Sequence, residues 1–135
     1  MPHNQAIDLQ IGSVAWSPCH IGKGLTVGSD CSIGALSHIG RNVTVGDGCR
    51  IQGGAYIADG CVLASEVFIG PNATLLNDRY PPSKGSEKWA SVHVAAKAVI
   101  GGGATVIAGL KVCENAVLGA RSTLTKHLPS NEVWV

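Results

Sequence analysis

The segment from residue 77 to residue 91 holds the side chains best suited to chemistry. It reads NDRYPPSKGSEKWAS and is polar, contains prolines and follows no repeat. A loop of this length in a small domain is usually functional or disordered. At its start, the Asn77 amide could orient an amine or a carbonyl, and the Asp78 carboxylate could hold a hydroxyl or an ammonium group. Asn and Asp are also common in Asx turns, so a purely structural role is the alternative.

Two histidines form a second candidate group. His20 and His38 are 18 residues apart. An imidazole titrates near neutral pH, so His20 could relay a proton. For His38 we favour the alternative, an outer ladder of histidines without a function. The five histidines do not follow the spacing of a zinc enzyme, so we expect no metal site.

The five cysteines include no CxxC pair and are odd in number, which fits neither a zinc site nor a disulfide framework. Cys31 and Cys49 are 18 residues apart, so a disulfide between them is geometrically conceivable. We expect reduced thiols instead, in a reducing, cytoplasmic compartment.

A six-residue repeat determines how all these side chains are positioned. Ten hexads follow one another without a break from residue 20 to residue 79. A period of six fits neither an amphipathic helix nor long alternating strands, but it fits short strands joined by tight turns that wind into a solenoid. The sequence therefore predicts a parallel β-helix. The second residue of every hexad is aliphatic: Ile21, Val27, Ile33, Ile39, Val45, Ile51, Ile57, Leu63, Ile69 and Leu75.

Three hexads, or 18 residues, would form one triangular coil. In that case Ile21, Ile39, Ile57 and Leu75 stack in one column at the spacing of paired strands, and the other aliphatic residues form two further columns. The residue four positions further along is small or medium-sized and should fill a corner. The glycine that follows most of the aliphatic residues, such as Gly22, suits a corner where a side chain would be costly.

The repeat is interrupted once. It stops after Leu76 and resumes at Val94 for six more hexads. We expect one domain over residues 1–135, composed of an initial coil at 1–16, hexads at 17–76, the protruding loop at 77–91, hexads at 92–127 and a C-terminal extension at 128–135.

The composition agrees with an all-β chain. There are 14 Val and 10 Ile residues and 18 Gly, which disfavour a helical bundle. The net charge of +1 gives no sign of binding to nucleic acid or to an anionic membrane. The longest apolar stretch, residues 98–110, is too short for a membrane span, and the polar start does not read as a signal peptide.

Three segments carry a resemblance to a known family. These are IGSVAWSPCHIG at residues 11–22, FIGPNATLLNDRYPPSK at 68–84 and VIGGGATVIAGLKVCENAVLGARSTLTKHLP at 99–129. They resemble the hexapeptide-repeat acyltransferases, and among these the bacterial nucleotide-sugar N-acetyltransferases that acetylate a 3-amino or similar amino sugar. The resemblance implies a left-handed β-helix, a homotrimer, active sites between neighbouring subunits, and acetyl-CoA along the outer face.

The resemblance also assigns functional residues. Asn77 matches the family's loop asparagine, and His20 matches a histidine that the family carries. Acetyl transfer from a thioester to an amine needs a neutral amine held in place, donors for the developing oxyanion, and an acceptor for the ammonium proton. We therefore expect Asn77, Asp78 and His20 to be the catalytic residues of an acetyl-CoA-dependent N-acetyltransferase acting on a nucleotide-linked amino sugar.

The last coils offer candidate cofactor contacts. Gly102 and Ala120 are 18 residues apart and should stack, so their N–H groups could meet the pantetheine carbonyls. Arg121 and Lys126 could approach the phosphates. Ordinary corner residues and solvated surface charges are the alternative interpretation of these positions.

Two other functions stay open. An O-acetyltransferase of the same fold usually has Asn-His in the loop, whereas Asp78 follows Asn77 here, which favours an amine acceptor. A non-catalytic or degenerate trimeric scaffold is the second possibility, because the chain departs from the family pattern at four positions. The replaced positions are Ala35, Leu36, Ala58 and Pro82.

Overall fold

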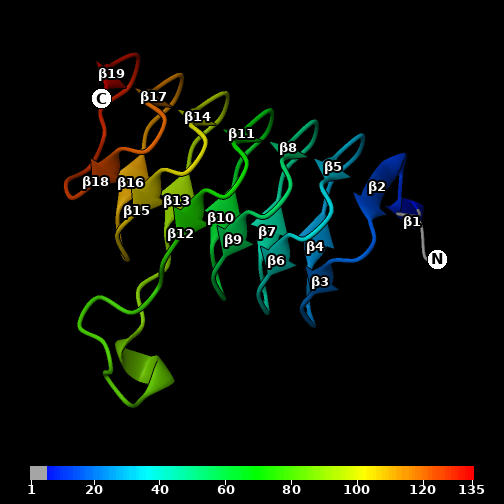
Figure 1. The fold of residues 1–135 in the computed structure, drawn as a ribbon, viewed down its shortest axis with the longest axis horizontal. Helices are drawn as coiled ribbons and strands as arrows, with labels where there is room; N and C mark the ends of the chain where they lie inside the picture. Colours follow the sequence, from blue (N-terminus) through cyan, green and yellow to red (C-terminus); the bar gives the residue numbers. More distant parts are fainter. Residues whose placement is uncertain (1–5) are drawn as a thin grey trace.

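Short strands wind around one axis in the computed structural model, which describes residues 6–135 (Figure 1). All but the first two strands are two residues long, as a hexad repeat requires. The strands are β1 (Ala6–Gln10), β2 (Ser13–Trp16), β3 (His20–Ile21), β4 (Thr26–Val27), β5 (Ser32–Ile33), β6 (His38–Ile39), β7 (Thr44–Val45), β8 (Arg50–Ile51), β9 (Tyr56–Ile57), β10 (Val62–Leu63), β11 (Phe68–Ile69), β12 (Thr74–Leu75), β13 (His93–Val94), β14 (Val99–Ile100), β15 (Thr105–Val106), β16 (Lys111–Val112), β17 (Val117–Leu118), β18 (Thr123–Leu124) and β19 (Val133–Trp134).

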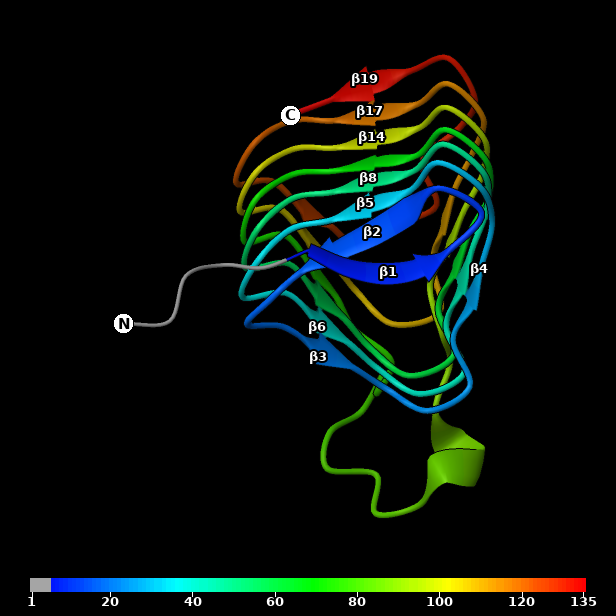
Figure 2. The same cartoon turned by 90° about the vertical axis from the view of Figure 1, so that its right-hand side faces the viewer.

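The strands form three sheets that are the sides of a triangular coil (Figure 2). Sheet A has the order β1-β2-β5-β8-β11-β14-β17-β19, sheet B has the order β18-β15-β12-β9-β6-β3, and sheet C has the order β16-β13-β10-β7-β4. In sheet B, Ile21 pairs with Ile39, Ile39 with Ile57, and Ile57 with Leu75. The coil of 18 residues and its predicted columns are therefore confirmed.

The coil is left-handed. Figure 2 looks down the axis from the N-terminal end, and the chain runs counterclockwise from sheet A to sheet B to sheet C as it recedes from the viewer. The usual crossover between parallel strands is right-handed. The left hand agrees with what the resemblance implied.

The core consists of the inward residues of the three sheets. The second residue of every strand from β4 to β18 is buried, and so are the corner residues Cys31, Val43, Cys49 and Cys61. The glycines that directly follow the strands are needed because the backbones of successive coils come into contact there. A Cβ on Gly22 would overlap the carbonyl of Gly40 in the next coil. Their role is close approach of two backbones rather than an unusual φ angle.

The two ends of the chain differ from the regular coils. Over residues 6–16, where an initial coil is predicted, β1 pairs antiparallel with β2 as a hairpin; residues 1–5 of that predicted coil lie outside the described residues. At the other end, the predicted C-terminal extension continues the solenoid, since β19 pairs in parallel with β17 and places Trp134 beside Leu118.

The protruding loop is an insertion at the corner between sheets B and C. Val94 follows Leu75 by 19 residues instead of six, yet it pairs with Leu63 as the regular repeat requires. The loop contains one turn of 3-10 helix, η1 (Ser86–Lys88), and stands away from the coil in Figure 2. Within residues 6–135, none of the helices has the length and apolar character to cross a bilayer.

We expect the cysteines to make stability fall at high pH. Burial raises the pKa of Cys49 and Cys61 from 9.0 to about 11. Folding therefore favours the neutral thiols, and this contribution is present below pH 9 and is lost as the pH rises towards 11. Urea unfolding at pH 8, 9.5 and 11 should show a smaller decline for the double variant Cys49→Ala, Cys61→Ala than for the unmodified chain. Equal declines would contradict this assignment.

Candidate functional site

Four polar residues form one column along the corner between sheets B and C. Lys23, Arg41, Asp59 and Asn77 are each 18 residues apart and so occupy the same position in successive coils. The loop begins at the last of them. The predicted residue Asn77 therefore lies directly beside Asp59 of the preceding coil, and Asn77 Nδ2 donates to the Asp59 carbonyl at 3.3 Å.

Arg41 and Asp59 are joined by several contacts. Asp59 Oδ1 accepts from the Arg41 backbone N–H at 2.7 Å, Asp59 Oδ2 accepts from Arg41 Nε at 2.9 Å, and Arg41 Nη2 lies 2.8 Å from Oδ2. Partial burial alone would raise the pKa of Asp59, but the hydrogen bonds and charge of Arg41 outweigh it and lower the pKa below its ordinary value. The pair is thus fixed and ionised at neutral pH. Arg41 Nη1 has no acceptor among residues 6–135.

The side chains of Asn77 and Asp78 differ in their hydrogen bonds. Asp78 Oδ1 accepts from Tyr80 N at 3.3 Å and Oδ2 from Ser83 N at 3.1 Å, which is the Asx-type turn considered above. The backbone carbonyl of Asn77 accepts from Ala90 N at 2.7 Å and closes the base of the loop. The Asn77 Oδ1 atom has no donor in the described part of the chain, so of the two side chains the Asn77 amide is better placed to contact a ligand.

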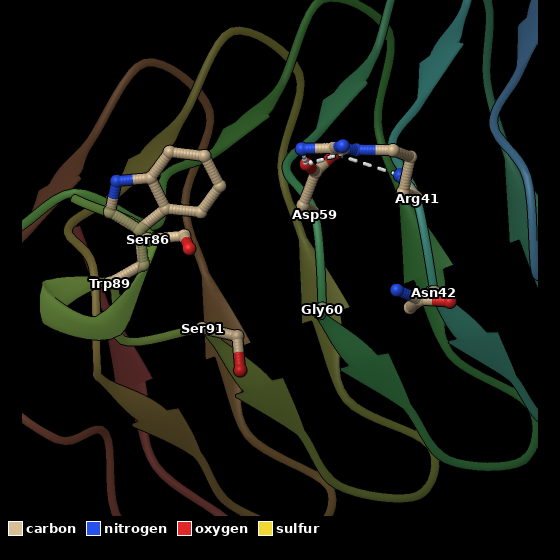
Figure 3. Close-up of a pocket in the computed structure, with 7 residues that line it drawn as sticks. All are labelled: Arg41, Asn42, Asp59, Gly60, Ser86, Trp89 and Ser91. Atoms are coloured by element: carbon tan, nitrogen blue, oxygen red, sulfur yellow. Dashed lines mark hydrogen bonds and ion pairs between the residues drawn. The ribbon is translucent and has the colours of Figure 1, made fainter.

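A groove of about 400 Å³ lies between this column and the loop (Figure 3). Figure 3 shows the indole of Trp89 on one side of it and the Arg41–Asp59 pair on the other. Trp89 follows η1, and its backbone N–H donates to the Ser86 carbonyl at 3.1 Å. The residues that line the groove are Arg41, Asn42, Asp59, Gly60, Ser86, Trp89 and Ser91.

His20 lies apart from Asn77 within one chain. It projects from the outer face of sheet B three coils away, which is roughly 14 Å at the spacing of paired strands. Its ring stacks on His38 at 4.6 Å between centroids, and His38 stacks on Tyr56 at 4.7 Å. Burial and the neighbouring His20 lower the pKa of His38, against the opposing effect of Asp59. The predicted stacking of His20 and His38 is confirmed.

The predicted cofactor residues fall into two places. Gly102, Ala120 and Arg121 lie at the corner between sheets A and B, where Arg121 N donates to the Gly102 carbonyl at 2.8 Å. A hollow of about 530 Å³ there is lined by Pro71, Asn72, Gly102, Gly103 and Arg121. Lys126 instead lines a separate hollow of about 430 Å³ at the C-terminal end of the coil, together with Arg121 and Trp134.

The loop and the Gly102 corner lie at opposite ends of the strands of sheet B, because the loop follows β12 whereas Gly102 precedes β15. In Figure 2 the loop leaves the lower corner of the triangle, between sheets B and C, whereas sheets A and B meet at the left-hand corner. Asn77 and Gly102 of one chain are therefore not brought together. No group of three or more His, Cys, Asp or Glu side chains within residues 6–135 is arranged to hold a metal ion.

Arg41, Asp59 and Trp89 line the groove but are not among the site residues predicted from the sequence. The signal for two of them was present, because counting back from Asn77 by 18 and 36 residues gives Asp59 and Arg41. Trp89 has no such signal, since it belongs to the aperiodic loop. The repeat therefore locates groove residues on the coil but not those on the loop.

Family models of known proteins match the repeats on both sides of the loop. The family model for the bacterial transferase hexapeptide (six repeats) matches residues 24–59 and 42–77, and the hexapeptide repeat of succinyl-transferase matches residues 94–126. A curated galactoside O-acetyltransferase from Lactococcus lactis subsp. lactis is 30% identical over 76 residues, which are 53% of this chain and 37% of that protein.

Solved structures share the fold at low identity. PerB from Caulobacter crescentus, in complex with CoA and GDP-perosamine, is 21% identical with a TM-score of 0.78, and the match covers 90% of this chain and 52% of that chain. The acetyltransferase domain of PglB from Neisseria gonorrhoeae FA1090, in complex with acetyl coenzyme A, is 16% identical with a TM-score of 0.79, covering 91% and 54%. The chain spans about half the length of these proteins.

Proposed function

We propose that this chain, a hexapeptide-repeat protein with the fold of the sugar acetyltransferases, transfers the acetyl group of acetyl-CoA to the amino group of a nucleotide-linked amino sugar. The observation that carries the proposal is the Asn77 amide: its Nδ2 donates to the Asp59 backbone carbonyl at the loop base, and its Oδ1, which has no donor among residues 6–135, can accept from an amine. The complexes of PerB with CoA and GDP-perosamine and of PglB with acetyl coenzyme A support it.

The proposed reaction is a single acyl transfer. The amine nitrogen of the sugar attacks the thioester carbonyl, the C–S bond breaks, and the proton lost by nitrogen goes to the departing CoA sulfur. An uncharged sugar amine is nucleophilic, so the chain mainly has to hold it in place, which an amide acceptor does. Asp78 supports the loop through its turn rather than acting as a base.

We place the donor site at the Gly102 corner of one chain and the acceptor site at the loop of a neighbouring chain. Gly102 and Ala120 would offer backbone groups to the pantetheine arm, and Arg121 would meet a phosphate. The two corners lie at opposite ends of the strands of sheet B, so they are separated within one chain. A closed assembly would bring the donor corner of one chain beside the loop of the next. We propose a homotrimer for this reason, in the cytoplasm, where the five cysteines stay reduced.

The test is the mass of the product. Incubation with acetyl-CoA and a panel of nucleotide-linked amino sugars, followed by mass spectrometry, should show one added acetyl group on at least one member. A thiol dye is unsuitable because the chain itself has five thiols. Failure to acetylate any member and to bind acetyl-CoA in calorimetry would contradict the proposal and favour a scaffold.

An O-acetyltransferase is the second candidate, supported by the galactoside O-acetyltransferase that matches over 76 residues. The same panel distinguishes the two, if each amino sugar is paired with the corresponding hydroxy sugar. An acetyl ester on the hydroxy sugar, cleaved by mild base, would favour the O-acetyltransferase. An amide that resists such treatment supports the N-acetyltransferase.

A further inference from the structure

We infer that the groove between Trp89 and the Arg41–Asp59 pair binds the pyranose ring of the acceptor substrate. The inference rests on the proposed function for the role of this sugar in the reaction. Its structural basis is independent of that function, since it concerns which chemical group the groove fits.

The two walls of the groove match the two kinds of surface on a pyranose. One wall is the indole of Trp89, a residue that is 39% exposed and whose ring faces the groove in Figure 3. A large aromatic face suits the apolar C–H face of a sugar ring. The other wall is Asp59 with Arg41, which offer acceptors and donors side by side to the hydroxyls at the ring edge.

The charge of the groove favours the sugar ring over a phosphate. Arg41 is already paired with Asp59 through Nε and Nη2, so its positive charge is compensated. Nη1, which has no acceptor in the described part of the chain, can donate to a neutral hydroxyl. The other polar lining groups, Asn42, Ser86 and Ser91, are uncharged. A diphosphate would need uncompensated cations, whereas a hydroxylated ring needs neutral donors and acceptors beside an aromatic surface.

A ring bound in the groove would have its amino substituent close to Asn77. Asp59 and Asn77 are in adjacent coils, about 4.8 Å apart at the spacing of paired strands, and they are hydrogen-bonded to each other. A ring seated against Asp59 would therefore reach Asn77 with the substituent on its next carbon. Gly60 has no side chain to fill the base of the groove, and a Cβ at this position would contact only Ser91, at 3.6 Å.

Nuclear magnetic resonance of the tryptophan indoles tests the ring assignment without any acetyl transfer. The full chain has three tryptophans, and the Trp89→Phe variant assigns the Trp89 signal by its loss. Titration with methyl 3-amino-3-deoxy-β-D-glucopyranoside should move the Trp89 Nε1–H signal and leave that of Trp134 in place. A shift with uridine diphosphate but none with the pyranoside would overturn the inference in favour of a nucleotide site.

Steady-state kinetics give a second readout with a matched control. Trp89→Ala should raise the KM for the acceptor by about tenfold, leaving the KM for acetyl-CoA unchanged, since loss of an aromatic contact is worth about 1.4 kcal/mol. Tyr80→Ala removes another exposed aromatic of the same loop that does not line the groove, and it should leave both constants unchanged. An unchanged acceptor KM in Trp89→Ala overturns the inference while the acetyltransferase function stands. A pyranoside shift in a chain that acetylates nothing leaves the groove assigned and refutes the function.

Discussion

Ile51→Asp is expected to abolish the folded state. Ile51 is 1% exposed and pairs with Ile33 on one side and Ile69 on the other, so a carboxylate there would have no polar partner. Burying an unpaired charge costs several kcal/mol, which is comparable to the whole free energy of unfolding of a small domain. Circular dichroism should show loss of β structure at 25 °C.

The control places the same residue on the outer face of the same sheet. Ser32 lies beside Arg50 in the register of β5 and β8, and its side chain points away from the core. Ser32→Asp should therefore fold, with an unfolding free energy within about 1 kcal/mol of the unmodified chain. If Ile51→Asp melted cooperatively at the same temperature as the unmodified chain, the assignment of Ile51 to the buried column between Ile33 and Ile69 would be wrong.

Most of the fold could be predicted because the repeat encodes it. The aliphatic residue of each hexad is buried in the structure except Ile21 of the first hexad, which is partly buried, and the 18-residue coil follows from stacking three hexads. The hand of the coil could not be predicted from the hexads, since the columns form equally in either hand; it came from the resemblance. The antiparallel β1–β2 hairpin was not predicted either, because Ile7 and Ile11 carry too little of the repeat to fix a register.

The candidate site was less accessible from the sequence. The repeat predicts both the stacking of His20 on His38 and the separation of three coils between His20 and Asn77. The contacts of the Asp78 carboxylate with Tyr80 and Ser83 depend on the path of an aperiodic loop. The position of Trp89 opposite Arg41 depends on the same path. Side chains on the coil obey a repeat, and side chains on the loop do not.

Mixing two inactive variants is expected to restore activity if each site joins two chains. Asn77→Ala removes the amide at the acceptor site, and Ala120→Trp blocks the donor corner from an exposed position without touching the core. Each variant alone should lose more than about 99% of turnover, since orienting an acceptor and binding a donor are both required. After denaturation and refolding of an equal mixture, about a quarter of the sites in a cyclic trimer should pair two intact halves.

The measurement is the rate of amide formation at saturating acetyl-CoA, compared with the two variants refolded separately and mixed afterwards. Near-wild-type melting temperatures for both variants exclude unfolding as the cause of inactivity. The double variant Asn77→Ala, Ala120→Trp, refolded with the unmodified chain, is the matched control, because it also dilutes intact chains while carrying both defects on one subunit. Recovery to about a quarter in the first mixture requires a site shared between chains. No recovery there, with activity in the second, would instead place both halves of the site within one chain, across sheet B, where the pantetheine arm would have to span from Gly102 to the loop.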